Sequence, residues 1–486
     1  MTPRGNAGYS SEMKRSLYAA TLCIASILSG GAIRADSPEI DRFVLGNGLE
    51  VLACRDDATP LARVRVVFKA GAENLEAESA GSLSLLERLV LRGLSASVDE
   101  RASGPLEWKG YATAESIGFG AVVPSSELDG ALASLASVLA SPPMDALEEA
   151  KEAAALAVRA SASDPDAIYE AAVTRRLFSK YPWRRDSAGS EKSIRAATAE
   201  SLAPIASAYL APGNAALIVS GRFDPAALRS SVAQRFAGWK DAPAARRTVP
   251  AHPKPGVTRP TWLVYPDPSM PEGKGSVELR YRGPDIARDG AASLAADLWS
   301  GLVADPNGRF KSAIFKEVPK LSAKDGISAG YVSQREGGTI SVSALFEIDP
   351  ALPAAERARA FKERVRGFEL TEMRSDPSYY SQQEYEAARS RLAARRDEEA
   401  DDPEGRIEAL AFWWSAASTD YYLGYPSAIA AAGPKDIASF IDAYVMKNLE
   451  VIAIRMNPTD YGRERASLSS SGFETITAAN AFWWPK

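Results

Sequence analysis

The chain has 486 residues, of which 46% are hydrophobic and 24% charged, and its formal net charge is −5. These proportions are typical of a folded globular protein of about two to four domains. Acidic and basic residues are interspersed, which excludes the basic surface of a nucleic-acid-binding protein, and we expect no nucleic acid partner. The only histidine is His252, so no metal site with two imidazole ligands can form within this chain.

The N-terminus has the pattern of an export signal. A basic pair at residues 14–15 precedes a moderately apolar run over residues 17–28, and Ala35 ends a small-residue cleavage site. We therefore predict a signal peptide over residues 1–35, with Met13 as an alternative start, and export to the periplasm or beyond. After cleavage we expect no stable membrane span.

Two cysteines bear on the processed form of the protein. Cleavage would remove Cys23, whereas a lipoprotein attached at Cys23 and an uncleaved membrane anchor are the alternatives. Cys54 would then be the only thiol, so we expect no internal disulfide. We interpret Cys54 as a small buried hydrophobe at the end of a strand rather than as a reactive nucleophile.

The first part of the chain mixes strands with long helices. The strands predicted from alternating or continuous apolar residues are Gly48–Ala53, Ala62–Phe68, Glu107–Ala114, Ser116–Val123 and Ala215–Ser220. The predicted helices are Ser79–Leu91, Ser126–Leu139, Asp145–Ala160, Pro165–Phe178, Ala199–Tyr209 and Pro225–Phe236.

The second part repeats much the same order of elements. Its predicted strands are Thr261–Tyr265, Ser276–Tyr281, Ile327–Ser333, Thr339–Phe346 and Leu449–Arg455. Its predicted helices are Ala291–Val303, Pro353–Arg366, Gln382–Arg396, Pro403–Ala417 and Pro434–Val445. The repeated order indicates an internal duplication.

A proline-rich segment divides the chain into these two halves. We predict an N-terminal half over residues 36–245, a linker over residues 246–258 and a C-terminal half over residues 259–460. Residues 461–486 form a tail that we expect to be a loose end or a docking strip. The fold class is α+β, with two homologous halves that each contain a mostly antiparallel sheet with helices packed on one face.

Five segments together resemble the insulinase/pitrilysin-like zinc metallopeptidases, a family that includes the subunits of the mitochondrial processing peptidase. The segments are Leu45–Val51, Val67–Ala72, Gly81–Gly93, Gly110–Thr113 and Tyr209–Asp224. Their order and spacing carry the resemblance, which covers residues 40–460. It implies two α+β halves, or two subunits, that close around an unfolded peptide like a clamshell.

The segment Gly81–Gly93 resembles the family's zinc helix, which carries the motif H-x-x-E-H. In that motif two histidines one turn apart bind zinc, and the glutamate between them activates water. Here Ser84 and Arg88 occupy the histidine positions, and Glu87 matches the general base. The third family ligand, a glutamate, falls at Ala157. All three ligands are thus replaced, and we expect no zinc in this chain.

The remaining carboxylates do not replace the lost ligands. Glu148, Glu149 and Glu152 lie one to two turns before the third ligand position, and we interpret them as a solvated helix face. Glu87 has no metal-bound water to deprotonate, and the neighbouring Arg88 favours its charged form. We therefore assign no catalytic residue.

Two further segments bear on peptide binding. Metal-free subunits of the family often supply an arginine and a tyrosine to the substrate, and Lys316 and Ala323 fall at those positions, with Tyr331 as a shifted alternative. Gly110, Tyr111, Ala112 and Thr113 resemble the family's strand whose edge pairs with substrate backbone. Backbone pairing needs no particular side chains, so these four residues and Lys316 are the peptide-binding candidates, with a plain sheet strand as the alternative.

The sequence therefore favours a catalytically inactive homologue of the family. Our first hypothesis is the non-catalytic subunit of a two-subunit periplasmic peptidase, with an active zinc-peptidase relative as heterodimer partner and an unfolded peptide as ligand. Zinc is then expected only in the active partner. The alternative is a stand-alone peptide-binding or scaffold protein of the cell envelope, which the changed Lys316 and Ala323 positions favour.

Overall fold

The computed structural model describes residues 40–97, 107–178, 186–243, 246, 249, 257 and 259–483. The predicted signal peptide lies outside the described residues, as do most of the predicted linker and the single histidine. None of the helices in these ranges combines the length and the hydropathy that crossing a lipid bilayer requires.

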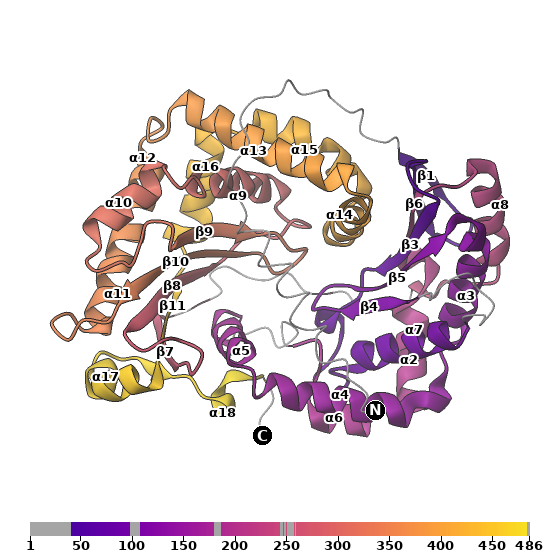
Figure 1. Cartoon of the computed structure of the whole chain (residues 1–486), viewed down its shortest axis with the longest axis horizontal. Coiled ribbons are helices and arrows are strands. Elements are labelled where there is room, and N and C mark those ends of the chain that lie inside the picture. The colour runs from indigo at the N-terminus through magenta and orange to yellow at the C-terminus, as the bar shows by residue number, and fades with distance from the viewer. Residues whose placement is uncertain are drawn as a thin grey trace. The chain divides into compact units, whose positions relative to one another are not determined.

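Two six-stranded sheets organise the described chain (Figure 1). The first sheet has the order β1-β2-β6-β3-β5-β4, and only the β2–β6 pair is parallel. Its strands are β1 (Ile40–Val44), β2 (Glu50–Arg55), β3 (Leu61–Phe68), β4 (Lys109–Ala112), β5 (Ile117–Pro124) and β6 (Ala215–Gly221).

The second sheet has the order β12-β7-β11-β8-β10-β9, and β11–β7 and β12–β7 are its parallel pairs. Its strands are β7 (Thr261–Pro266), β8 (Lys274–Arg282), β9 (Ile327–Val332), β10 (Thr339–Glu347), β11 (Val451–Met456) and β12 (Glu474–Thr475). From its second strand to its last, the order β7-β11-β8-β10-β9 repeats the connectivity of β2-β6-β3-β5-β4 in the first sheet. The predicted α+β fold with two similar halves is therefore confirmed.

Each half covers one face of its own sheet with helices. In the first half these are α2 (Ser82–Ala96), α3 (Leu128–Ala140), α4 (Leu147–Ser161), α6 (Glu191–Ala196), α7 (Ala199–Tyr209) and α8 (Pro225–Arg235). In the second half the corresponding helices are α9 (Gly290–Val303), α10 (Arg309–Glu317), α11 (Ala354–Lys362), α12 (Leu370–Ser375), α13 (Gln382–Asp401), α15 (Thr419–Ala431), α16 (Pro434–Ile441) and α17 (Pro458–Ser470).

The opposite face of each sheet is covered by one helix from the other half. Both helices were predicted from the sequence, but this packing across the halves was not. Helix α14 (Pro403–Ala416) packs on β3 and β6 of the first sheet, and α5 (Pro165–Leu177) packs on β8 and β11 of the second (Figure 1). The physical reason is the apolar character of both faces: every residue of β6 is buried. The exchange of helices joins the two halves through two apolar contacts.

The C-terminal tail is built into the second half. Strand β12 pairs with β7, and α18 (Ala478–Ala481) packs on α5. The guanidinium of Arg175 in α5 donates to the backbone carbonyls of Asn480 and Phe482 at 3.1 and 2.7 Å. The tail thus docks on the helix that the first half contributes to the second sheet.

Candidate functional site

Helix α2 carries two of the family's ligand positions, Ser84 and Arg88. At the first of them, the Ser84 side chain makes a structural hydrogen bond. Ser84 is half-buried, and its Oγ donates to the backbone carbonyl of Ser187 at 2.7 Å. The hydroxyl of Ser187 in turn donates to the carbonyl of Ala112 in β4 at 2.9 Å. The loop over residues 186–190 therefore connects the helix to the predicted docking strand.

Two glycines allow this loop to lie directly on the start of α2. Gly81 and Gly189 both have left-handed backbones, with φ of 88° and 78°. A Cβ on Gly189 would lie 2.5 Å from the carbonyl oxygen of Ala80, and a Cβ on Gly81 would lie 2.7 Å from that of Ala188. Only glycine fits both the backbone conformation and the contact at these positions.

We predict that Ser84→Ala loosens the loop. The substitution leaves the carbonyl of Ser187 without its donor, which costs about 1 kcal/mol locally. Amide hydrogen exchange over residues 186–190 should become faster. The matched control is Ser79→Ala, because the exposed Ser79 hydroxyl donates to its near neighbour Glu76 at 3.3 Å. Equal exchange in both variants would contradict the assigned role of Ser84.

Glu87 faces the docking strand rather than open solvent. A Cβ on Gly110 would lie 2.9 Å from Oε1 of Glu87 and 3.1 Å from Cδ1 of Leu91, so the carboxyl lies against β4. Burial raises the pKa of Glu87 to about 7, and the charge of Arg88 only partly opposes this. Arg88 favours the charged form of Glu87, as expected, but desolvation by burial is the larger effect and was not foreseen.

Arg88 places a cation at the second ligand position. Its Nε is buried and has no hydrogen-bond partner among the described residues. A guanidinium offers donors only and has no lone pair for a metal ion. The chemistry of this side chain is thus opposed to metal binding.

The predicted third ligand position lies on α4, which packs on α2. Ala157 is half-buried there. Glu148, Glu149 and Glu152 have side chains 84%, 69% and 66% exposed, so they lie on the outer side of the helix. Each of them pairs with a basic side chain at the surface, as predicted for a solvated face.

These residues do not fit a zinc ion. The hydroxyl at position 84 is used as a donor, the side chain at position 88 is a cation, and alanine at position 157 has no donor atom. Within the described residues, no group of three or more histidine, cysteine, aspartate or glutamate side chains could hold a metal.

The predicted docking strand β4 is the edge strand of the first sheet. The N–H of Thr113 donates to the carbonyl of Ser116 at 2.8 Å. Because paired and unpaired residues alternate in an antiparallel ladder, Tyr111 is also turned toward β5, and the backbone groups of Gly110 and Ala112 point to the outer edge. The Ser187 hydroxyl already occupies the Ala112 carbonyl at this edge.

The side chain of Tyr111 lies on the sheet and not at its edge. A Cβ on the neighbouring Gly118 would lie 2.7 Å from Cε1 of Tyr111, so the ring fits only over a glycine. Burial is the main reason that the pKa of Tyr111 is raised to about 12. Because the backbone groups of Tyr111 are turned toward β5, any peptide contact of this residue would use the outer face of its ring.

In the second half, Lys316 lies at the end of α10. Its side chain is 82% exposed, and its Nζ lies 3.8 Å from Oε1 of the adjacent Glu317. The hydroxyl of Tyr331, the alternative for the second position, donates to the carbonyl of Pro284 at 2.8 Å and lies 3.2 Å from Ser293 Oγ. Tyr331 is thus engaged within its own half.

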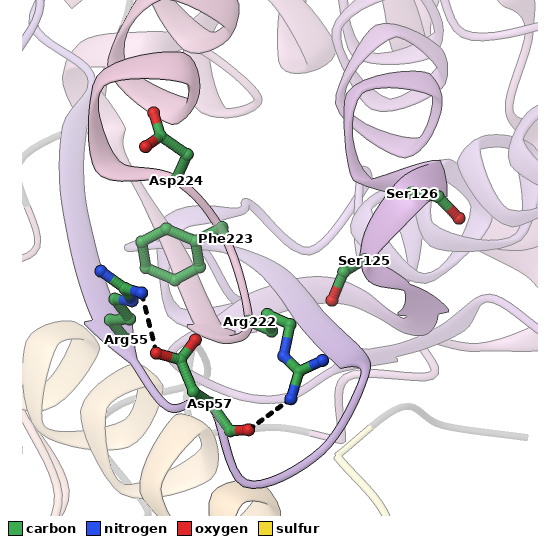
Figure 2. A pocket seen from close by; sticks show the side chains of 7 residues that line it. All are labelled: Arg55, Asp57, Ser125, Ser126, Arg222, Phe223 and Asp224. Carbon is green, nitrogen blue, oxygen red and sulfur yellow. Dashed lines mark hydrogen bonds and ion pairs between the residues drawn. The ribbon is translucent and has the colours of Figure 1, made fainter.

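A cavity of about 590 Å³ lies at the ends of the parallel strands β2 and β6 (Figure 2). Its charged groups contact one another: Arg55 pairs with Asp57 at 2.8 Å, and Arg222 donates to the carbonyl of Asp57 at 2.6 Å. Asp224 caps α8 by accepting from Ala227 N–H at 2.7 Å. We assign no ligand to this cavity.

Sequence reasoning did not find Ser187 or Arg335, which the structure brings to the docking strand. Ser187 lies 103 residues from Ser84 in the chain. Arg335 lies 220 residues from Glu115, whose carboxylate accepts its backbone N–H at 2.8 Å. Neither residue belongs to a motif, so only the fold reveals them.

No family model and no curated protein matches the sequence. Solved structures are similar: a protease from Helicobacter pylori has a TM-score of 0.69 and 16% identity, covering 86% of this chain and 99% of that chain. An M16-like peptidase from Alicyclobacillus acidocaldarius has a TM-score of 0.69, 17% identity and coverage of 86% and 98%. A peptidase M16 inactive domain from Pseudomonas fluorescens has a TM-score of 0.66, 15% identity and coverage of 86% and 98%. The fold predicted from the resemblance is therefore confirmed: this chain has the two-half fold of the M16-like, insulinase/pitrilysin-like peptidases.

Proposed function

We propose that this chain is a catalytically inactive peptidase homologue that serves as the non-catalytic subunit of a two-subunit peptidase. The observation that carries the proposal is the use of Ser84 and Arg88, where the fold would otherwise place metal ligands. The Ser84 hydroxyl donates to Ser187, and Arg88 adds a cation. Glu87 is left without a metal-bound water to activate.

In this proposal the chain retains one contribution to peptide binding. The outer edge of β4 offers the backbone groups of Gly110 and the N–H of Ala112 to an extended peptide, which would add a strand to the sheet, while the Ala112 carbonyl already accepts from Ser187. An active relative would bring zinc and the glutamate base. The predicted signal peptide supports placing the pair in the periplasm.

The experiment is purification of the tagged native protein from its own cells, followed by mass spectrometry and zinc analysis. A stoichiometric relative that carries H-x-x-E-H, with about one zinc per pair, would support the proposal. Recovery of the chain without such a relative, and without zinc, would contradict it. The N-terminal residue of the purified chain, read in the same experiment, tests cleavage after Ala35.

The stand-alone peptide-binding or scaffold protein is kept as a second candidate because of the second half. Lys316 points into solvent, Ala323 has no polar side chain, and Tyr331 donates to its own half. These positions lack the groups with which a complementing subunit would contact the substrate. Zinc-independent binding of an unfolded protein by the isolated chain would favour this candidate.

A further inference from the structure

The turn between β4 and β5 is held by the other half of the chain. Both carboxylate oxygens of Glu115 in this turn accept backbone N–H groups, from Arg335 at 2.8 Å and from Glu336 at 3.0 Å. Nη2 of Arg335 also donates to the backbone carbonyl of Glu115 at 2.7 Å. The second half therefore holds the turn through the side chain of Arg335 and through the backbone N–H groups of Arg335 and Glu336.

The guanidinium of Arg335 has two further partners besides the Glu115 carbonyl in the described part of the chain. It pairs with Glu73, whose side chain is fully buried, and its Nη1 donates to the carbonyl of Ser415 at the end of α14 at 3.1 Å. The N–H of Glu73 donates to the carbonyl of Ala114 at 3.0 Å, so Glu73 belongs to the support of the same turn. Charge-assisted bonds of this kind fix geometry more strongly than neutral ones.

The segment that carries Arg335 is itself fixed to the second half. Ser333 Oγ donates to Asp297 at 3.1 Å, and the N–H of Ile286 donates to the carbonyl of Gln334 at 3.0 Å. The side chain of Arg288 pairs with Glu336 at 2.6 Å. A displacement of this segment would therefore be transmitted to the turn at Glu115.

Strand β4, which leads into this turn, is short and has a neighbouring strand on one side only among the described residues. Strand β4 has four residues, and β5 is its strand partner among the described residues. A strand of this length depends on its ends for its position, because few ladder hydrogen bonds hold it. The turn at residues 113–116 is one of those ends.

We propose that Arg335 is a positioning residue, which sets the place of the β4 docking edge through Glu115 and Glu73. It makes no contact with the peptide in this role. The inference rests on the proposed peptide-binding function and adds that the second half controls the edge that the first half presents. An Arg335 substitution should then change peptide affinity through the strand.

The test uses the full chain and two readouts. The rate of amide hydrogen exchange over residues 109–119 shows how firmly the hairpin of β4 and β5 is held. The affinity for fluorescein-labelled β-casein, an unfolded protein, shows whether the edge of β4 binds peptide. Arg335→Gln should accelerate the exchange and weaken casein binding, each by about tenfold. Arg335→Lys should be intermediate, because lysine keeps the charge and loses the planar fork. Glu115→Gln should act in the same direction, because it replaces one of the two accepting carboxylate oxygens by an NH2 group, which can only donate.

Arg366→Gln is the matched control. Arg366 also pairs with a fully buried carboxylate, Glu450, at 2.5 Å, but it does so within the second half. It should lower stability without changing either readout. If Arg335→Gln leaves the hairpin exchange unchanged, or if the control changes it equally, the positioning role is overturned. If the hairpin loosens as expected and the unsubstituted chain does not bind casein, the positioning of the hairpin is supported and the peptide-binding function fails.

Discussion

Replacing Trp414 by alanine is expected to lower the free energy of unfolding by about 3–5 kcal/mol and to expose Cys54 to thiol reagents. Trp414 is 6% exposed and belongs to the buried apolar cluster that α14 forms with the first sheet across the boundary between the halves, a cluster that also contains Leu52 and Cys54. Its Nε1 donates to Oε2 of Glu50 at 2.8 Å, and Nζ of Lys69 lies 4.6 Å from the ring centre. The substitution leaves a cavity, an unpaired carboxylate oxygen and a cation without its aromatic face.

The rate at which Cys54 reacts with a thiol reagent measures the loss of packing in this cluster. The thiol is completely buried, and burial raises its pKa to about 11. In the folded chain the thiol should therefore react very slowly. The measurement combines a urea titration with the rate of reaction of a maleimide, in a chain in which Cys23→Ser removes the second thiol.

Trp262→Ala serves as the control for the Trp414 substitution. Trp262 lies in the second half, where its ring centre is 5.3 Å from that of Phe473. It should lower stability with a smaller effect on the labelling of Cys54. An unchanged unfolding midpoint and labelling rate in Trp414→Ala would show that α14 does not hold the first sheet.

The strands were predictable because their apolar patterns are local. Strand β6 was predicted from a continuous apolar run, and all of its residues are buried. The reason for that burial was not predictable, since it depends on α14, which begins 182 residues after the end of β6 (from Gly221 to Pro403) and belongs to the other half. Helix α15 was missed because Gly424 and Pro426 interrupt its pattern.

The candidate site also has features that could be predicted from the sequence and features that could not. Positions 84, 87 and 88 could be placed because they lie in one motif frame on one helix. The partner of Ser84 could not, because Ser187 lies in a loop without a recognisable pattern. The assignment of Ala157 to the third ligand position remains a prediction from spacing. The pKa of Glu87 required the structure, because burial and the neighbouring cation act in opposite directions.

Replacing Asp297 by asparagine is expected to stabilise the protein above neutral pH. Asp297 lies on α9 near the segment that carries Arg335, and its Oδ1 accepts from Ser333 Oγ at 3.1 Å. Tyr421 and Tyr425 from α15 and Arg395 from α13 are the other groups that act on it. Burial is the dominant effect and raises the pKa of Asp297 from 3.8 to about 7. The charged carboxylate is therefore poorly compensated in the folded state.

The sign of the pH dependence follows from the direction of this change. Because the folded protein binds the proton more tightly than the unfolded chain, Asp297 destabilises the fold progressively as the pH rises from about 4 to about 7. The full effect is about 2–4 kcal/mol at pH 8. Asp297→Asn should raise the unfolding midpoint at pH 8 and leave it nearly unchanged at pH 4. Asp325→Asn, at an exposed turn before β9, is the control and should not change the difference between the two pH values. If Asp297→Asn lowers the midpoint equally at both, the carboxylate is a needed hydrogen-bond acceptor for Ser333 and not a buried charge that weakens the second half.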